Sequence, residues 1–498
     1  MKKIMRTLLF LALFFPIVVS FAIIPVAGQT GNVVVLTPHY SSIYDVYVDA
    51  FEAKYPGITV EIKPMSTPLC YAHLLETKDD TDTDVWWGGG LDWFSKARDD
   101  ELLAMYTLKP EAEGNITDEL FGLPLKDPDK YFYGSALSGF GIMYNTRYLD
   151  EHNLPIPENW EDLTDPVYMG HISVARPSRS GSTHMIVEII LQAFGWDEGW
   201  KLLLQIGANC GEFTEKSGYV PDHVQVGEFG VGLVIDFYGY SSTGEGYPTA
   251  FFYPINQTVI NPDSIAKVAN SKNPDNADLF IDFVLSYEGQ SLLFNPSIFR
   301  MPVREDVYVE APAGYFNPFT TTMNVIEYNS TLGELRTVLV DALFDDVITY
   351  RHTELQTAWK QIWAIEEQIE IAKGTVDTST ANSTLNDAIQ LASIPPVDAL
   401  TSEDVSFNEQ FETDATFASD QEAMWDTYAA TNYNEAYDTA SDAYAQIFEK
   451  LPIISQLNTE ISTLETEIAG LTSMVYAAIG LAVIGILIGA VGMFMRKS

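Results

Sequence analysis

The sequence predicts an α/β head, followed by an α-helical stalk and a C-terminal transmembrane helix. Between residues 31 and 309, short apolar β-rich runs alternate with amphipathic helical patterns, an order typical of a mostly parallel sheet wrapped by helices. After residue 332 only helical patterns remain, and their composition is acidic. The uncharged stretch 474–495 is long enough to cross the roughly 30 Å hydrocarbon core of a membrane as a helix.

The head begins with an apolar run, Asn32–Leu36, which predicts a strand. The loop Thr37–Ser42 leads into an amphipathic helix, and Pro56 and Gly57 stop that helix. The later elements are expected as strands at Ile58–Ile62, Asp84–Trp87, His171–Ala175 and Gly230–Phe237, and as helices at Tyr71–Thr77 and Thr183–Phe194. In such sheets, ligands bind at loops beyond the carboxyl ends of the strands.

The stalk is expected over residues 333–473. Glu334–Lys373 and Ser419–Phe448 each carry an apolar face, which predicts two long helices. The segment between them, 374–401, is rich in Ser, Thr, Asn and Pro and is expected to be a linker. Residues 374–449 contain no Lys or Arg but many Asp and Glu, so the stalk has a strongly acidic part.

A seven-residue apolar repeat leads into the membrane segment. The seam consists of Ile454, Leu457, Ile461, Leu464, Ile468 and Leu471, which have the a and d spacing of a coiled coil over residues 454–471. Gly485 and Gly489 continue this spacing inside the membrane segment and would let two helices approach closely. The seam pairs either with a second copy, giving a homodimer, or with the stalk helices of its own chain.

Both ends of the chain indicate export and anchoring. Lys2, Lys3 and Arg6 precede an apolar run that ends in small residues, which predicts a secretory signal over 1–28. An uncleaved second anchor is the alternative. Arg496 and Lys497 follow the transmembrane segment and mark its cytoplasmic side, so 496–498 is a cytoplasmic tail. The mature chain is therefore expected on the extracellular face, held by a single pass.

Composition limits the possible binding partners and the possible covalent modifications of the chain. The net charge of −42 argues against nucleic acid and suits a soluble surface in salty water or a positively charged partner. Candidate glycosylation sequons occur at Asn115, Asn256, Asn329 and Asn382. An oxidising compartment permits a bridge between Cys70 and Cys210, and two buried thiols are the alternative.

Several motifs follow one another in a recognisable order between about Asn32 and Val307. They are Phe51–Val60, Asp84–Gly90, Leu102–Tyr106, Gly141–Asn145, Pro157–Leu163, Asp165–Ile172, Ser180–Thr183, Asn273–Ser286 and Gly289-Gln290. In this order and spacing, the head resembles the extracellular solute-binding proteins of ABC transporters, in the subgroup of ferric-ion, thiamine, aminoethylphosphonate and polyamine binders. None of the motifs is specific alone.

The resemblance implies a two-lobed, periplasmic-binding-protein-like (Venus flytrap) head. Lobe 1 would comprise residues 29–137 and 256–332, and lobe 2 residues 138–255, with crossings near Gly134–Gly141 and Ala250–Asn261. The ligand would be held between the lobes and delivered to an ABC permease and its ATPase. The sequence has no Walker loop, so this chain is not that ATPase. With the C-terminal anchor, the resemblance implies an archaeal member, and it implies no cofactor.

Four loops lie where such a clamp would hold its ligand. The candidate ligand-binding residues are His39 and Tyr40; Trp87, Gly88 and Gly89; Ser180, Gly181, Ser182 and Thr183; and Asp236 and Tyr238. Glycines let backbone N–H groups approach a ligand, and hydroxyl groups at a helix N-terminus suit an anion. Ordinary turns and helix caps are the alternative explanation.

The ligand class stays open at this point. A small organic ion or anion fits the glycine and serine loops. Ferric iron is an alternative, although Phe237-Tyr238 replaces the adjacent tyrosines of ferric binders, and His39 and Tyr240 would have to compensate. A cationic amine would suit Trp86, Trp87 and Asp236.

Other function classes have less support. The sequence contains no H-E-x-x-H array and no G-x-S-x-G elbow between a strand and a helix, so we do not expect an enzyme. A structural or adhesive surface protein built on a binding-protein fold is the alternative, because the stalk is long and acidic.

Overall fold

The structure is a computed structural model that describes residues 29–312, 315–321 and 323–495. The expected signal segment and the tail 496–498 lie outside the described residues, as do the side chains of 452–455 and 487–495. The chain forms two compact units. The head unit comprises Met1–Trp160, Ile172–Ala193 and Glu212–Asp341, and the helical unit comprises Glu161–His171, Phe194–Gly211 and Ala342–Ser498.

One long strand, β7 (Phe132–Asn145), joins two halves of the sheet in the head unit. Its first part pairs antiparallel with β12 (Ile260–Val268), and its second part with β10 (Val231–Ile235) and β11 (Thr249–Phe252). The register passes from β12 to β10 between Gly139 and Phe140. The chain therefore crosses between the halves inside the segment Gly134–Gly141, where the resemblance implied a crossing.

Parallel strands complete both halves of the sheet, which has the order β2-β1-β3-β12-β7-β10-β8-β9. The bounds are β1 (Gly31–Thr37), β2 (Ile58–Pro64), β3 (Val85–Trp87), β8 (Ile172–Ala175) and β9 (Cys210–Thr214). Short strands are β4 (Leu103–Ala104), β5 (Glu119–Leu120) and β6 (Leu123–Pro124). Five consecutive residues of β1 are buried because both faces of the sheet are covered. The predicted α/β class is confirmed.

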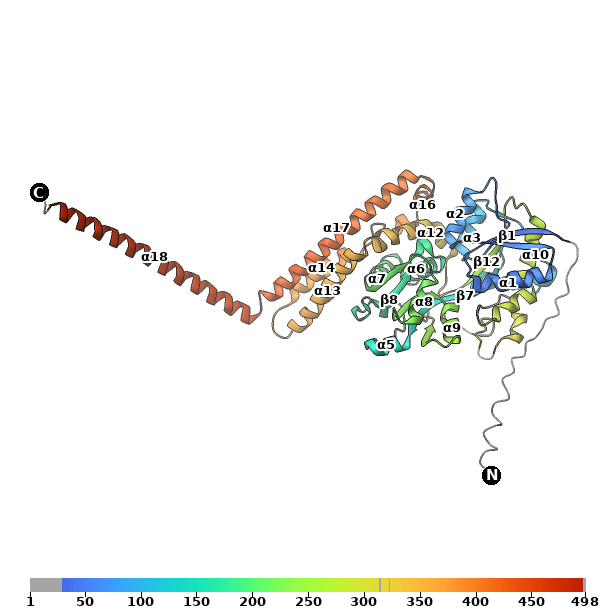
Figure 1. Ribbon diagram of the computed structural model, residues 1–498, viewed down its shortest axis with the longest axis horizontal. Helices are drawn as coiled ribbons and strands as arrows, with labels where there is room; N and C mark the ends of the chain where they lie inside the picture. Colours follow the sequence, from blue (N-terminus) through green and yellow to red (C-terminus); the bar gives the residue numbers. More distant parts are fainter. Residues whose placement is uncertain (1–28, 313–314, 322, 496–498) are drawn as a thin grey trace, which may run out of the picture. The chain divides into compact units, whose positions relative to one another are not determined.

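Helices begin where these strands end. The helices that follow strands β1, β2, β3, β8 and β10 are α1 (Ser41–Lys54), α2 (Thr67–Glu76), α3 (Leu91–Asp99), α6 (Gly181–Phe194) and α9 (Asp236–Gly244). Further helices of this unit are α4 (Pro110–Glu113), α5 (Thr146–His152), α8 (Tyr219–Val226), α10 (Pro274–Val284) and α11 (Tyr287–Ser291). Figure 1 shows α1 and α10 beside β1 and β12. This order places several helix N-termini at one edge of the sheet.

The end of β10 differs from the expectation. The predicted strand Gly230–Phe237 stops at Ile235, and Asp236 already belongs to α9. The carboxylate of Asp236 accepts a hydrogen bond of 2.7 Å from the N–H of Phe237, and an acidic residue in a first helical turn is favourable. Tyr238 therefore lies in the first turn of a helix.

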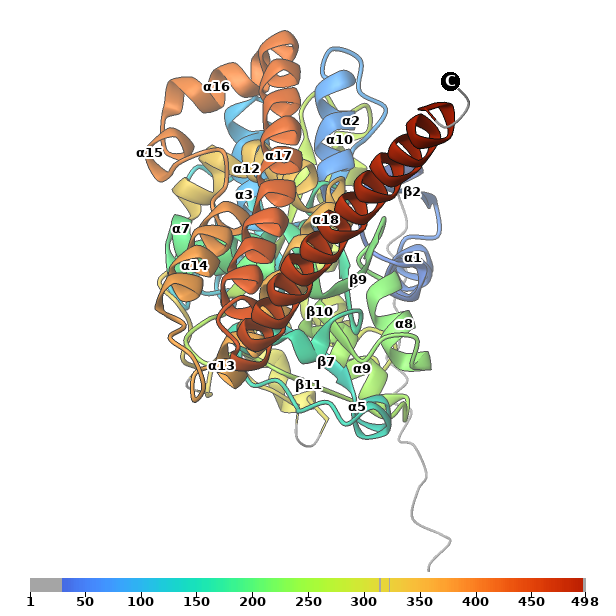
Figure 2. The same cartoon turned by 90° about the vertical axis from the view of Figure 1, so that its left-hand side faces the viewer.

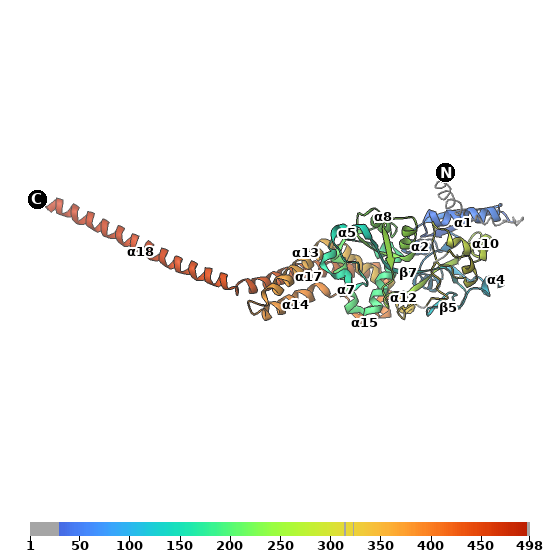
Figure 3. The same ribbon diagram turned by 90° about the horizontal axis from the view of Figure 1, so that it is seen from below.

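In the helical unit, α7 (Trp196–Asn209), α13 (His352–Ala372), α14 (Ser379–Ser393) and α17 (Ala415–Phe448) pack together. Figures 1 and 3 show α13, α14 and α17 side by side. Short helices α15 (Ala399–Ser402) and α16 (Val405–Thr413) precede α17. The single helix predicted over Glu334–Lys373 is wrong, because α12 (Ser330–Phe344) ends in a π-helical turn, Asp345–Thr349, before α13 begins.

The linker predicted over 374–401 is also wrong, since α14 occupies most of it. Ala381, Leu385, Ala388 and Ala392 are buried on one face of α14, which packs against α17. A stripe with this spacing is the mark of an amphipathic helix. The Ser, Thr and Asn residues of the segment occupy the remaining faces, which is why composition alone suggested a linker.

The last helix, α18 (Pro452–Met495), runs without interruption, as Figure 2 shows. Its described side chains, from Gln456 to Ile486, are all exposed. Among the described residues, one helix is long and apolar enough to cross a membrane, and it lies within α18. Of the expected seam, the side chain of Ile454 lies outside the described residues. The two cysteines, Cys70 and Cys210, are buried thiols.

Candidate functional site

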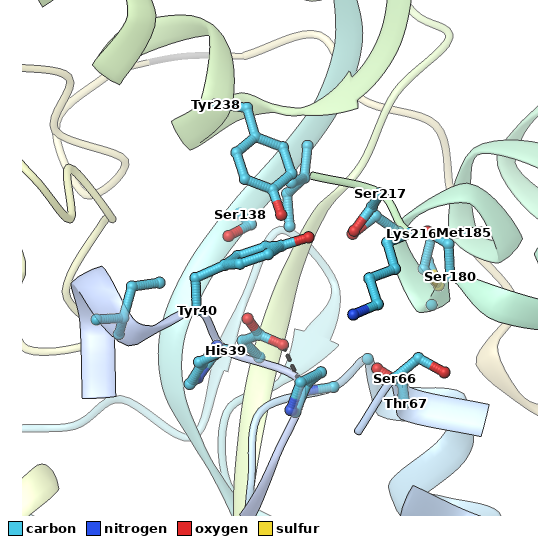
Figure 4. Close-up of a pocket in the computed structure, with 18 of the residues that line it drawn as sticks. His39, Tyr40, Ser66, Thr67, Ser138, Ser180, Met185, Lys216, Ser217 and Tyr238 are labelled. Carbon is cyan, nitrogen blue, oxygen red and sulfur yellow. Dashed lines mark hydrogen bonds between the residues drawn. The ribbon is translucent and has the colours of Figure 1, made fainter. Parts of the chain in front are cut away.

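A cavity of about 560 Å³ opens at the carboxyl edge of the sheet in the head unit (Figure 4). The loops that follow β1, β2, β3, β8, β9 and β10 contribute to its lining, together with residues of β7 and β12. Strands β7 and β12 run side by side beneath the cavity. The cavity is therefore placed where open α/β sheets bind their ligands.

Four helices start at this cavity. The N-cap residues of α1, α2 and α3 are Tyr40, Ser66 and Gly90, all three line the cavity, and none accepts a capping hydrogen bond through its side chain. At α6, by contrast, Ser180 Oγ accepts a hydrogen bond from the N–H of Thr183 at 3.1 Å. Uncapped N–H groups and the positive ends of helix dipoles favour a negatively charged ligand.

The floor of the cavity is organised by Arg300, whose side chain is 2% exposed. Its guanidinium donates to Ser138 Oγ at 2.8 Å, forms an ion pair with Asp263, and lies 4.7 Å from the ring centre of Phe237. Its Nη1 also lies 3.3 Å from Nδ1 of His39. One cation thus ties together β7, β12, α9 and the loop after β1.

The charges on the floor are balanced internally. Burial alone would raise the pKa of Asp263, but the Arg300 guanidinium, His39 and the N–H of Gly89 together outweigh burial and hold this pKa below its usual value. Burial, and then Arg300, lower the pKa of His39 to about 3, so His39 is neutral and accepts the hydrogen bond from Arg300. Because Arg300 and Asp263 compensate each other, the floor contributes little net charge toward a ligand.

The rim supplies net positive charge. Arg179 and Lys216 line the cavity, and Figure 4 shows the Lys216 ammonium group pointing into it. Glu215 also lies at the rim, where its carboxylate is 3.0 Å from Arg176 and 3.7 Å from Arg179. Since one carboxylate is shared by two arginines, Lys216 remains as a cation that faces the cavity.

One wall of the cavity is aromatic. The rings of Tyr40 and Tyr238 meet edge to face with centroids 5.9 Å apart (Figure 4). The hydroxyl oxygen of Tyr40 accepts a hydrogen bond of 2.7 Å from the N–H of Gly218. Burial, followed by the neighbouring Tyr40, raises the pKa of Tyr238 well above its usual value, so Tyr238 is a phenol in this environment.

Seven of the eleven expected ligand-binding residues line the cavity. They are His39, Tyr40, Gly89, Ser180, Gly181, Ser182 and Tyr238. They come from four loops that are far apart in sequence, and the structure brings them together. Whether they contact a ligand stays a prediction.

The other four lie one layer behind the cavity. Trp87 packs edge-on against His39 at 4.7 Å, and a side chain at Gly88, where φ is +103°, would collide with that imidazole. Thr183 donates to Ser180 Oγ at 3.0 Å. Asp236 accepts hydrogen bonds from the N–H of Gly139 at 2.6 Å and the hydroxyl of Tyr253 at 2.8 Å, and burial raises its pKa to about 6. These residues support the cavity rather than line it.

The expectation of an amine site on Trp86, Trp87 and Asp236 is wrong. Both indoles are at most 2% exposed, and Trp86 stacks on Phe94 at 4.2 Å. Tyr240 likewise does not complete a metal site, because it packs against Phe251 at 5.2 Å and does not line the cavity. These aromatic residues belong to the packed layers around the sheet.

Sequence reasoning missed several residues that line the cavity: Ser66, Thr67, Lys216, Asn261, Asp263 and Arg300. Ser66 and Thr67 precede Pro68 at the start of α2, a recognisable helix start signal. Nothing in the local sequence marks Asp263 or Arg300. Of the expected sequons, Asn115, Asn256 and Asn329 are exposed, whereas Asn382 is partly buried. Their glycosylation stays a prediction.

Residues 90–322 match the family described as bacterial extracellular solute-binding protein. The chain is also 30% identical over 301 residues to the phosphoglycerate transport regulatory protein PgtC of Salmonella typhimurium, and the alignment covers 60% of this chain and 70% of that protein. This chain belongs to the extracellular solute-binding protein family. An uncharacterized protein of Haemophilus influenzae is 28% identical over 270 residues, which is 53% of this chain and 76% of that protein.

Solved structures show the same fold. The periplasmic binding protein AfuA from Actinobacillus pleuropneumoniae, with fructose-6-phosphate bound, aligns with a TM-score of 0.60 and 23% identity over 64% of this chain and 99% of AfuA. Iron-bound HitA from Pseudomonas aeruginosa aligns with a TM-score of 0.52 and 20% identity over 62% of this chain and 98% of HitA. The predicted binding-protein head is confirmed.

Membership of the solute-binding protein family implies a small ligand, a permease partner and a place outside the cytoplasm. Proteins of this family are binding components of transporters, not enzymes. Among the described residues of this solute-binding protein, no group of three or more His, Cys, Asp or Glu side chains is arranged to hold a metal ion.

Replacing Asp263 by Asn should destabilise this solute-binding protein by roughly 3–5 kcal/mol at neutral pH, because Arg300 would be left buried without its partner. The folded-state pKa of Asp263 is depressed, so its contribution is present above the unfolded value of about 3.9 and is lost as the pH falls through the folded value. The stability difference from wild type should therefore shrink below about pH 4.

Chemical denaturation followed by tryptophan fluorescence at several pH values measures this difference. Asp82→Asn is the matched control, since Asp82 is half exposed and its ion pairs with Lys63 and His73 should each contribute only about 0–1 kcal/mol. A destabilisation by Asp263→Asn no larger than that of the control would show that the floor does not depend on the ion pair.

Proposed function

We propose that this protein is the membrane-anchored, extracellular binding component of an ABC importer, and that its ligand is a small phosphorylated organic anion. The observation that carries the proposal is the convergence of three uncapped helix N-termini with Arg179 and Lys216 around one cavity. Such a set of donors suits a group that presents several oxygen atoms and negative charge.

A phosphate ester fits this lining better than inorganic phosphate does. A phosphoryl group carries a charge of about −1.5 to −2 near neutral pH and three acceptor oxygens. The cavity, of about 560 Å³, has room for an organic body beside that group. Tyr40, Phe140, Met185 and Tyr238 offer surfaces for its carbon atoms, and Ser138 offers a hydroxyl. The name of PgtC and the fructose-6-phosphate in AfuA point to the same chemical class.

The anchor is proposed to be α18, with the head outside the cell and the C-terminus in the cytoplasm. The length and apolar composition of this helix support a single membrane crossing. Arg496 and Lys497 support this orientation. The binding component would then stay in the same membrane as its permease and would not be lost to the surroundings.

Ferric iron is the second candidate ligand, and the pair of Tyr40 and Tyr238 in the cavity favours it. Phenolate oxygen is a hard ligand that suits Fe(III), and HitA binds iron on the same fold. If iron is the ligand, the iron-loaded protein should absorb visible light through tyrosinate ligation, and Tyr238→Phe should abolish that band. A colourless protein that loses iron on dialysis would reject this candidate.

For the phosphorylated ligand, 3-phosphoglycerate and fructose 6-phosphate should raise the melting temperature of the detergent-solubilised chain by mass action. Glycerate and fructose, which lack the phosphoryl group, should not. Lys216→Gln should weaken binding about 10- to 100-fold, the effect of losing about 1.5–3 kcal/mol from a charge-assisted hydrogen bond.

Lys272→Gln is the matched control, because Lys272 pairs with Asp80 at the surface and does not line the cavity. Equal responses to the phosphorylated and unphosphorylated compounds would contradict the proposed ligand class. If no compound of either class nor iron bound, a structural or adhesive role would be favoured instead.

A homodimer through the seam is proposed for the anchored protein. Ile at a and Leu at d, as in Ile461 and Leu464, favour two parallel strands. The described seam residues from Leu457 to Leu471 are 46–62% exposed, so they are available to a second copy. Gly485 and Gly489 would let the membrane helices approach on the same face.

Crosslinking in membranes tests this pairing, with Leu464→Cys on the seam and Thr463→Cys beside it. Both are placed in a background in which Cys70 and Cys210 are replaced by Ala. A disulfide-linked dimer should form at position 464 and not at 463, because only the seam positions face each other across a coiled coil. No crosslink at either position would assign the seam to the helices of its own chain.

A further inference from the structure

A short segment downstream of the residues that match the family spans both halves of the head. This segment, Tyr328–Asp341, contains Tyr328 and most of α12, and it follows residue 322, where the match ends. It contacts α3, which follows β3 on the β12 side of β7. It also contacts α6, which follows β8 on the β10 side. We call this segment the strap.

The contact with α3 is polar and buried. The hydroxyl of Tyr328 donates a short hydrogen bond to the carboxylate of Asp92, which is 0% exposed. Gly333 lies directly against both groups, since a Cβ atom there would come within 2.5 Å of the Tyr328 hydroxyl and 2.7 Å of Asp92. Glu334 shares a hydrogen bond with Asp99 at the other end of α3. The strap therefore follows the length of this helix.

The contact with α6 includes two buried ion pairs. Arg336 donates to Glu188 through Nε at 3.1 Å and Nη2 at 2.7 Å, and both side chains are at most 3% exposed. His184 Nδ1 lies 2.8 Å from the Asp341 carboxylate, and these side chains are 0% and 7% exposed. Breaking a buried pair of this kind is strongly unfavourable, so the strap holds α6 firmly.

Both clamped helices begin at the ligand cavity. Gly90 lines the cavity two residues before Asp92, and Ser182 lines it two residues before His184. Met185 lines the cavity as well, and its sulfur lies 3.8 Å from the Tyr328 hydroxyl. A movement of either helix relative to the other would thus change the cavity and the strap together.

Two atoms in this cluster have no partner, although they are fully buried. They are Oδ1 of Asp92 on α3 and Nε2 of His184 on α6. These side chains come from opposite halves of the sheet and influence each other electrostatically.

We propose that the strap is a latch on the clamp, in which Tyr328 and Arg336 act as positioning residues that hold α3 and α6 together and so favour the closed arrangement of the halves, both without a ligand and when a ligand binds. The latch rests on the proposed binding function only in the test that measures ligand affinity. Its structural basis is the set of buried contacts that join one strap to two halves of the head.

Proton uptake should accompany closure of the latch. Burial raises the pKa of Asp92 to about 7, against the opposing effects of Tyr328, His184 and Arg336. Burial lowers the pKa of His184, but Asp341, Asp92 and Glu188 outweigh it and raise the value to about 9. Both groups bind a proton more tightly when buried in the latch than when open to solvent, so their support for closure is greatest at low pH and is lost as the pH rises.

Further charged side chains surround Asp92 and His184. Lys96, Arg98 and Asp99 belong to α3, Glu188 to α6, and Glu334, Arg336 and Asp341 to the strap. Burial, and then Asp99, raise the pKa of Glu334 to about 8, which acts in the same direction as Asp92. Asp92 and Glu334 thus act in the same direction, whereas the hydrogen bond from Arg98 holds the pKa of Asp99 below its usual value. Closure should weaken as the pH rises from about 5 to 9.

The ligand-free protein provides the first test. Spin labels at Met105→Cys and Val226→Cys, two exposed positions on opposite halves, report the distance between the halves in the detergent-solubilised full chain. Tyr328→Phe keeps the ring and removes the hydrogen bond to Asp92, so the distance distribution should shift to longer values. Tyr287→Phe, which removes a surface hydrogen bond to Glu310, should leave it unchanged. Identical distributions for Tyr328→Phe and wild type would overturn the latch.

Ligand affinity over pH provides the second test, with 3-phosphoglycerate as the probe. Asp92→Asn mimics the neutral carboxyl group, so it should bind the probe like wild type near pH 5 and several-fold more tightly near pH 8. Comparing the two proteins at each pH cancels the titration of the probe itself. A variant that was merely damaged would bind more weakly at every pH, and that result would contradict the latch.

The two tests separate the two proposals. If 3-phosphoglycerate binds neither protein at any pH, the proposed ligand class fails, and the spin-label distances alone decide the latch. Arg336→Met offers an independent variant for the distance measurement, because it breaks the pair with Glu188 and leaves Tyr328 in place. It should also lengthen the distance, and a distribution identical to that of wild type would reject the latch, as it would for Tyr328→Phe.

Discussion

The ion pair of Arg300 with Asp263 is the constraint on which the ligand cavity depends. The guanidinium reaches β12 through Asp263, β7 through Ser138 and α9 through Phe237, so three elements are fixed around one cation. Asp263 in turn accepts a hydrogen bond of 2.6 Å from the N–H of Gly89, and this bond holds the loop that leads into α3. An ion pair this deeply buried is not an efficient source of stability, but it specifies position strongly because neither partner tolerates separation.

Much of the head could be predicted from local sequence. Strands β1, β2, β3 and β8 lie within a residue or two of their expected bounds, and α1 follows the expected loop Thr37–Ser42. Helix α2, expected from Tyr71, begins earlier, at Thr67. Ser180, Gly181 and Ser182 were expected at the site mainly because their segment resembles the substrate loop of the solute-binding proteins, in a loop between a strand and a helix. The local sequence pattern was sufficient to predict an element wherever the residues that define it are near one another in the chain.

The rest depended on contacts that local pattern does not encode. Arg300 and Asp263 are separated by many residues, and only the fold brings them under the loop that carries His39. Glycines at Gly88 and Gly89 suggested ligand contact for both, yet Gly88 is needed because the His39 ring occupies the space of a side chain. In α14, by contrast, the stripe of Ala381 and Leu385 was present in the sequence, and polar composition concealed it.

A chain with a net charge of −42 can still bind an anion, because most of its exposed carboxylates lie too far from the cavity to repel the ligand strongly. Charges separated by more than about 8 Å are largely screened at physiological salt, so the many exposed carboxylates have little effect inside the cavity. Helix N-termini, Arg179 and Lys216 act at contact distance and in partly buried surroundings, where electrostatic interactions are stronger. The acidic surface and the proposed anion site are therefore compatible: the surface charge favours solubility of the head, and the proposed site would act on a ligand only at close range.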